Sequence, residues 1–206
     1  MIWQILPLIG TILLLVVAFV LRPWMQFRRY GTWGVLLFHS NSPRLIVLDS
    51  LTVILFLLLP AQAYIAAYRP DYLEAYLVLD GAAKALSTYI GTLIFFGGLI
   101  FFAEAQLNLG ASWRIGIDRS AKLGLITDGL YSFCRNPVYL GLLIMAVGYA
   151  LMVPTLLSLA LAAIDYAAMR RQIADEESYL LLMYGDEYRR YAGKVGRFLP
   201  GFGKLR

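Results

Sequence analysis

The residues best suited to chemistry lie in the last third of the chain. Asn136 and Pro137 predict the start of a helix, because Asn is a strong N-cap and Pro fits the first helical position. The free amides at such a start can bind a carboxylate or another anion. Tyr131 and Tyr139 add aromatic faces nearby, which attract a sulfonium as they do other cations. The segment is therefore a candidate ligand site, and the alternative is that both tyrosines are interfacial anchors.

Three carboxylates are candidates for catalysis or ligand binding. Glu104 lies near the end of an apolar stretch, where a carboxylate is a functional candidate unless it snorkels or pairs with an arginine such as Arg114. Glu176 and Glu177 can accept hydrogen bonds from a ligand's hydroxyl or amine, or else form a solvated charged face. Asp165 lies inside the last apolar segment, so we expect it to find a partner or water.

Beyond these carboxylates the sequence predicts a second, shorter helix. Gly185 is expected to end the preceding helix, and Asp186 is expected to cap the next one. Tyr184, Tyr188 and Tyr191 recur at i, i+4 and i+7, which predicts one helical face packed on the membrane segments or at the interface.

The composition places the chain among integral membrane proteins. Of its 206 residues 60% are apolar and only 15% are charged, against about 25% charged in a soluble domain. The net charge of +5 comes from basic residues beside apolar runs, which predicts contact with membrane lipids and not with nucleic acid. With one cysteine, Cys134, and one histidine, His39, no intramolecular disulfide can form and we expect no metal site.

The elements that position these residues are predicted to be membrane helices. Apolar runs at residues 2–21, 45–68, 85–109, 138–153 and 155–169 predict an all-α polytopic protein with about five spans. The last two runs are short and meet at Pro154, which indicates a C-terminal helical hairpin. Gly91, Gly97 and Gly98 are expected to allow close helix packing. We divide the chain into a three-span region, 1–109, and a functional region, 110–206.

Charge distribution predicts the orientation of the spans. Residues 22–44, 110–136 and 170–206 hold 16 of the 18 Lys and Arg residues, and only Arg69 and Lys84 lie in the remaining loops. Cytoplasmic loops carry the excess of basic residues, so the N-terminus is predicted outside and the C-terminus in the cytoplasm. The candidate cofactor site is then cytoplasmic.

An ordered set of motifs resembles the isoprenylcysteine carboxyl methyltransferase family and the related phospholipid methyltransferases. The resemblance covers about residues 109 to 200. Its pieces are Leu109-Gly110-x-x-Trp113, Arg135-Asn136-Pro137-x-Tyr139-x-Gly141, an apolar hairpin, Glu176-Glu177, Tyr184-Gly185-Asp186-Glu187-Tyr188-x-x-Tyr191 and Val195-x-Arg197-x-x-Pro200.

The resemblance implies S-adenosylmethionine as the methyl donor and a lipophilic, lipid or prenylated acceptor. Where this chain has Asn136 the family often has histidine, and both residues can form hydrogen bonds. Carried over by position, the cofactor-binding residues are Leu123, Gly124, Leu125, Ile126, Tyr131, Asn136, Pro137, Val138, Tyr139 and Glu176.

The acceptor side departs from the family pattern. The family's substrate-binding arginine corresponds most closely to Gln172, with Arg171 beside it at a different helical phase. Arg197 is the candidate to hold an acidic acceptor instead, and Glu104 or Glu177 could assist an amine acceptor in losing its proton.

Other functions remain open from the sequence. The acceptor group can be a carboxylate, an amine or a thiol, which includes phospholipid N-methylation. Sterol reductases that use NADPH share a related C-terminal architecture, and a non-catalytic membrane scaffold is the remaining alternative. Binding of S-adenosylhomocysteine, of NADPH or of neither separates the three classes.

Overall fold

The structure, a computed structural model, describes residues 2–38, 43–115 and 124–205. Within these residues it is all-α, with three isolated bridges and no strand. The α-helices are α1 (Ile2–Val16), α2 (Arg22–Tyr30), α3 (Pro43–Tyr68), α4 (Gly81–Asn108), α5 (Pro137–Met152), α6 (Leu156–Tyr184) and α7 (Asp186–Lys194). The predicted fold class is therefore confirmed.

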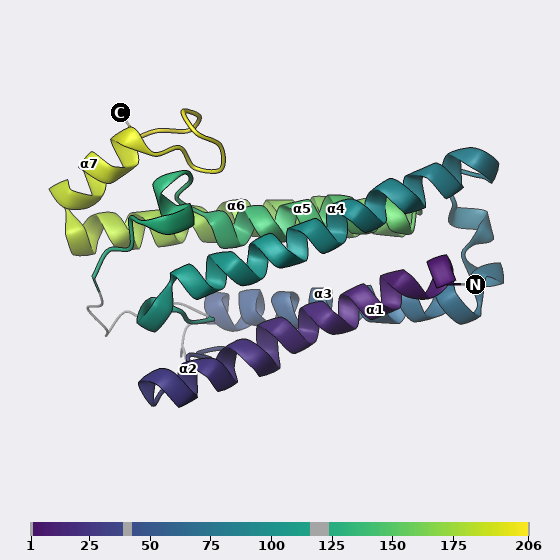
Figure 1. Cartoon of the computed structure of the whole chain (residues 1–206), viewed down its shortest axis with the longest axis horizontal. Helices are drawn as coiled ribbons and strands as arrows, with labels where there is room; N and C mark the ends of the chain where they lie inside the picture. The colour runs from purple at the N-terminus through teal and green to yellow at the C-terminus, as the bar shows by residue number, and fades with distance from the viewer. Residues whose placement is uncertain (1, 39–42, 116–123, 206) are drawn as a thin grey trace.

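The long helices run side by side along the longest axis of the molecule (Figure 1). Helix α1 packs mainly on α3, and α4 packs along α5, which in turn packs on α6. The N-terminus and the α3–α4 connection lie at one end, while α2, α7 and the C-terminal tail lie at the other (Figure 1). The motifs that the sequence singled out as polar therefore gather at one end of the bundle.

Within the part of the chain that the structure describes, three helical stretches are long and apolar enough to cross a membrane. They are Trp3–Tyr30, Asp49–Tyr68 and Gly81–Asn108, and Pro137–Met152 is a shorter apolar helix. Membrane integration is thus supported, while the count of five spans stays a prediction. The division at residue 110 also stays a prediction, since α4 from the first region packs along α5 from the second.

The first helical stretch continues past its apolar run, which ends at residue 21, as far as Tyr30. A π-helical turn, Val17–Leu21, joins α1 to α2, so part of the expected polar loop 22–44 is helical. Arg22 is buried, donates to the carbonyls of Gln106 and Gly110 at 3.2 and 2.9 Å, and lies over the Trp113 ring. The first carbonyl lies in the last turn of α4 and the second just beyond it, where backbone carbonyls have no partner within the helix. The arginine therefore enters the protein instead of contacting lipid headgroups.

The last long helix also extends past its apolar run. We expected the span to end at Met169, but α6 continues to Tyr184 and carries Glu176 and Glu177 within it. Residues 170–183 contain neither Gly nor Pro and are rich in good helix formers, so nothing stops the helix before Gly185. Gly185 ends it as predicted and occupies the N-cap position of α7, leaving Asp186 as the first helical residue.

Helices α4 and α5 approach closely at glycines. A Cβ atom on Gly148 would lie 2.5 Å from the backbone nitrogen of Phe95, and one on Gly91 would lie 2.6 Å from the carbonyl oxygen of Gly148. Gly98 is also tightly packed, against Ile144 and Met145. The prediction for Gly97 was wrong, because a Cβ there would meet no atom within 4 Å.

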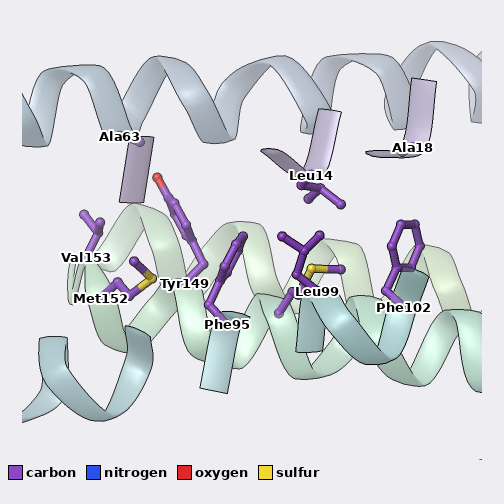
Figure 2. Packing of buried hydrophobic residues seen from close by; sticks show 10 residues of the cluster. Leu14, Ala18, Ala63, Phe95, Leu99, Phe102, Tyr149, Met152 and Val153 are labelled. Atoms are coloured by element: carbon purple, nitrogen blue, oxygen red, sulfur yellow. The ribbon is translucent and has the colours of Figure 1, made fainter. Parts of the chain in front are cut away.

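The apolar core lies between α1 and α3 on one side and α4 and α5 on the other. Phe95, Leu99 and Phe102 of α4 point toward the opposite helices, which carry Leu14 and Ala63 (Figure 2). Tyr149 of α5 crosses the core and donates a hydrogen bond from its hydroxyl to the carbonyl of Leu59 at 2.9 Å. The core and this hydrogen bond hold α5 against α3.

Substitution of Gly148 tests the close approach. Gly148→Ala should lower the unfolding midpoint, because overpacking a filled interface costs about 1–3 kcal/mol and here the obstacle is backbone. Gly97→Ala is the matched control, and it should be neutral or stabilising by up to about 1 kcal/mol through helix propensity. Thermal unfolding in lipid nanodiscs measures both. Equal midpoints for the two variants would contradict this packing.

Candidate functional site

A cavity of about 360 Å³ lies at the end of the bundle that carries the polar motifs. Its walls come from α3, the end of α4, the segment before α5, the first turns of α5, α6 and α7. Phe19, Phe56 and Leu142 give it an apolar side, while Asn136 and Glu176 give it a polar one. Small-molecule pockets typically have volumes of about 300–1,000 Å³, and this cavity lies near the lower end of that range.

Glu177 is the centre of a buried cluster of charges behind this cavity. Its Oε1 accepts from Arg135 Nη2 at 2.9 Å, and its Oε2 accepts from Arg197 Nη2 at 2.6 Å. Asn136 Nδ2 donates to the same carboxylate at 3.3 Å. Burial alone would raise the pKa of Glu177, but the hydrogen bonds from Arg197 and Arg135 outweigh burial and hold the pKa below its ordinary value. Glu177 is therefore ionised, and both of its carboxylate oxygens accept hydrogen bonds from the protein.

Arg135 connects that cluster to the tail. Besides Glu177, it donates to the carbonyls of Ala192, Val195 and Gly203 at 2.9, 2.6 and 3.0 Å. Its own backbone N–H donates to the carbonyl of Gly196 at 2.9 Å. The sequence analysis counted Arg135 as a basic loop residue and as part of the family-like motif, but assigned it no role in the site. The available signal was its position at the start of that motif, directly before the predicted helix start.

Asn136 occupies the predicted N-cap position of α5, with Pro137 as the first helical residue. Its side chain does not cap the helix, however, and donates instead to Glu177 and to the carbonyl of Arg197. The charge cluster therefore takes precedence over local capping. The backbone amides of Val138 and Tyr139, which belong to a helix's first turn, have no carbonyl partner within α5.

Glu176, next to Glu177 in α6, points into the cavity from another face of the helix. It lines the cavity and accepts a short hydrogen bond from the hydroxyl of Tyr139. Burial raises the pKa of Glu176 to about 7, although the neighbouring Tyr139 hydroxyl and Gln172 amide act in the opposite direction. Glu176 is thus a carboxyl group poised between its neutral and charged forms near pH 7, in reach of a ligand.

Most of the predicted cofactor-binding residues gather on this cavity. Pro137 is buried at the start of α5 and does not line it, and Leu123 lies outside the described residues, as does His39. Those that line the cavity are Gly124, Leu125, Ile126, Tyr131, Asn136, Val138, Tyr139 and Glu176.

The predicted catalytic and acceptor-binding residues are distributed differently. Gln172 lines the cavity, but Arg171 is exposed on another face of α6. Glu177 and Arg197 pair with each other outside the cavity lining. Glu104 is exposed on α4 and accepts from Asn108 Nδ2 at 2.9 Å. The structure therefore does not bring Glu104, Glu177, Arg171 or Arg197 into the cavity.

We expected Tyr184, Tyr188 and Tyr191 to lie on one helix, but they belong to two. Gly185 separates Tyr184, the last residue of α6, from Tyr188 and Tyr191 of α7. All three nevertheless line the cavity, and the hydroxyl of Tyr191 donates to the carbonyl of Tyr131 at 2.6 Å. Together with Tyr131 and Tyr139 they give the polar end an aromatic wall suited to a cation.

Comparison with known proteins agrees with this arrangement. The family model described as phospholipid methyltransferase matches residues 86–187. A protein-S-isoprenylcysteine O-methyltransferase of Schizosaccharomyces pombe is 34% identical over 48% of this chain and 43% of that protein. A probable protein-S-isoprenylcysteine O-methyltransferase of Oryza sativa subsp. indica is 34% identical over 55% of this chain and 61% of its own length. The chain thus spans about half of these relatives.

Two further matches cover a larger share of the matched protein's own length. The solved structure of the eukaryotic intramembrane Ras methyltransferase ICMT (isoprenylcysteine carboxyl methyltransferase) superposes with a TM-score of 0.58 at 18% identity, over 92% of this chain and 63% of that one, which shows a shared fold. Protein-S-isoprenylcysteine O-methyltransferase B of Arabidopsis thaliana is 30% identical over 54% of this chain and 68% of that protein. On this evidence the chain belongs to the isoprenylcysteine O-methyltransferase family.

Proposed function

We propose that this protein transfers a methyl group from S-adenosylmethionine to a lipophilic acceptor at the membrane interface. The observation that carries the proposal is one cavity with two characters, an aromatic and polar end beside Glu176 and an apolar end between membrane helices. The names of the relatives support methyl transfer to an isoprenylcysteine carboxylate. The description of the matched family model makes an amine lipid the second candidate acceptor.

The residues present suit the donor. Glu176 would accept hydrogen bonds from its ribose hydroxyls or its ammonium group, and the free amides of Val138 and Tyr139 would bind its carboxylate. Tyr131 and the tail tyrosines would surround the positive charge. When bound, the donor supplies an electrophilic methyl group on a sulfonium.

The protein's own contribution is positioning and exclusion of water. A carboxylate acceptor needs no general base, so the absence of Glu104 and Glu177 from the cavity lining is compatible with O-methylation. The charge cluster around Glu177 holds α6, the start of α5 and the tail in one arrangement, and this fixes the wall that carries Glu176 and Tyr139. Helices on the other side keep the acceptor end apolar.

We also infer that the N-terminus faces outside and the C-terminus faces the cytoplasm. The support is the 16-to-2 distribution of Lys and Arg, together with the gathering of α2, α7 and the tail at one end of the bundle (Figure 1). The donor would then enter from the cytoplasm. Reporter fusions after Lys84 and at the C-terminus should report opposite sides of the membrane, and the same side for both would exclude this orientation.

Donor binding should depend on Glu176 and on pH. Glu176→Gln should weaken S-adenosylhomocysteine binding about 10- to 100-fold at pH 8, the loss expected for one charge-assisted hydrogen bond. In the unsubstituted protein binding should strengthen as pH rises through about 7, because the carboxylate form is the one that binds. Calorimetry between pH 6 and 8 measures both effects.

Glu187→Gln is the matched control for this experiment, since Glu187 is exposed on α7 and does not line the cavity. It should bind like the unsubstituted protein. A pH dependence that persists in Glu176→Gln would assign the titration to another group. Binding of NADPH in place of S-adenosylhomocysteine would instead support a reductase, and binding of neither would support a scaffold.

Product identification tests the reaction itself. Purified protein given methyl-labelled donor and membrane extract should place label in an extractable lipophilic product. Among synthetic S-alkyl cysteine acceptors, activity should rise with chain length, because each buried CH₂ contributes about 0.8 kcal/mol. Equal labelling of short, water-soluble acceptors and long-chain ones would contradict a lipophilic acceptor site.

A further inference from the structure

Asp165 is an ionisable residue in the apolar part of α6 that the proposed donor site does not use. It shares one helical face with Met169, Gln172 and Glu176, at spacings of four, three and four residues, and all four line the large cavity. At 1.5 Å per residue, Asp165 lies about 16 Å from Glu176 along the helix axis. It therefore marks the far end of the cavity from the proposed donor-binding carboxylate.

At that end a second, smaller cavity begins. It has a volume of about 50 Å³ and is lined mainly by apolar side chains of the core, among them Leu14, Leu59, Phe95 and Met145. Asp165 lines both cavities, as do Leu55, Phe56 and Leu142. A ligand with its tail in the small cavity and its head in the large one would therefore pass Asp165 at the boundary.

Among the residues that the structure describes, Asp165 has no protein partner at this boundary. No hydrogen bond or ion pair joins its carboxylate to any residue within 2–38, 43–115 and 124–205. Two cations are found among the described residues of the cavity wall, Arg114 and Arg135. Arg135 is committed to Glu177 and three carbonyls, and Arg114 follows α4 at the polar end.

A carboxylate without a partner in an apolar wall is costly, and such residues in membrane helices usually mark a ligand or ion path. The group that best offsets this cost is a hydrogen-bond donor, above all a charged one. An anionic head at the same place would be repelled, with Asp49 and Glu176 the other carboxylates on the wall. The boundary between the two cavities therefore favours a ligand with an N–H group over one with an anionic head group.

We propose that Asp165 is an acceptor-binding residue, whose carboxylate receives a hydrogen bond from an N–H group, charged or neutral, of a lipid-tailed ligand seated across the two cavities. The ligand's apolar chain occupies the small cavity and its nitrogen lies beside Asp165. The proposal rests on the proposed methyl transfer only in identifying this ligand as the acceptor. Asp165 thereby sets which lipophilic molecules enter the site.

Binding of three matched probes tests the site without requiring turnover. The probes are dodecylamine, N-dodecylacetamide and dodecanoate, and the protein is held in nanodiscs of neutral phosphatidylcholine. The unsubstituted protein should bind the amine and the amide at least about tenfold more tightly than the acid, the range expected for a hydrogen bond to a charged group. Asp165→Asn should remove that preference and leave S-adenosylhomocysteine binding unchanged.

Two further variants keep the outcome decisive. Asp186→Asn, at an exposed carboxylate of α7, is the control for nonspecific partitioning and should retain the preference. Asp165→Leu should lose the preference and raise the unfolding midpoint of the ligand-free protein, because the partnerless carboxylate is gone. No preference in the unsubstituted protein, or an equal loss for all three probes in Asp165→Asn, would overturn the proposal.

The same samples separate this proposal from the proposed function. Loss of S-adenosylhomocysteine binding in the unsubstituted protein, with the nitrogen preference intact, would refute methyl transfer and retain the Asp165 site. Normal S-adenosylhomocysteine binding without any nitrogen preference would refute the Asp165 site and retain methyl transfer.

Discussion

The interaction on which the rest of the site depends is the carboxylate of Glu177 held between Arg135 and Arg197. It joins three segments distant in sequence, namely the start of α5, the last third of α6 and the C-terminal tail. A buried ion pair gains stability only when its remaining donors are also satisfied, and Arg135 meets that condition through one carbonyl of α7 and two of the tail. Removing one partner of such a pair costs about 3–5 kcal/mol, because it leaves a buried charge uncompensated.

That constraint explains the geometry of the cavity. With Glu177 fixed on one face of α6, Glu176 is directed to another face, where Tyr139 donates to it. The tail returns over the start of α5 and brings Tyr188 and Tyr191 to the same wall. On the membrane side, the glycine contacts between α4 and α5 and the core around Tyr149 set the spacing of the helices. The charged cluster thus organises the polar end, and helix packing organises the apolar end.

The sequence predicted those features that follow from local rules. Pro137 begins α5, the turn at Pro154 separates α5 from α6, and Gly185 ends α6, because proline and glycine act on the backbone near them. Most of the residues that the resemblance assigned to the cofactor site line one cavity in the structure. Their role as ligands for the donor remains a prediction.

Features set by long-range contacts were missed. Arg22 and Arg135 were read as basic loop residues, since nothing nearby in sequence reveals the carbonyls of Gly110 or Gly203 that they meet. Glu104 was a catalytic candidate from its depth in an apolar run, but helical phase directs it outward, toward Asn108. Helical phase alone did not decide whether Asp165 faced lipid or a cavity, and the packing of the other helices around α6 shows that it lines one.

The decisive measurement is a structure of the protein with S-adenosylhomocysteine. The ligand should lie in the large cavity, with its polar groups at Glu176 and the first turn of α5, and with its sulfur directed toward the Asp165 end. The Glu177 cluster should keep its present partners. Ligand bound outside this cavity, or bound with its sulfur turned away from the junction with the small cavity, would refute methyl transfer at this site.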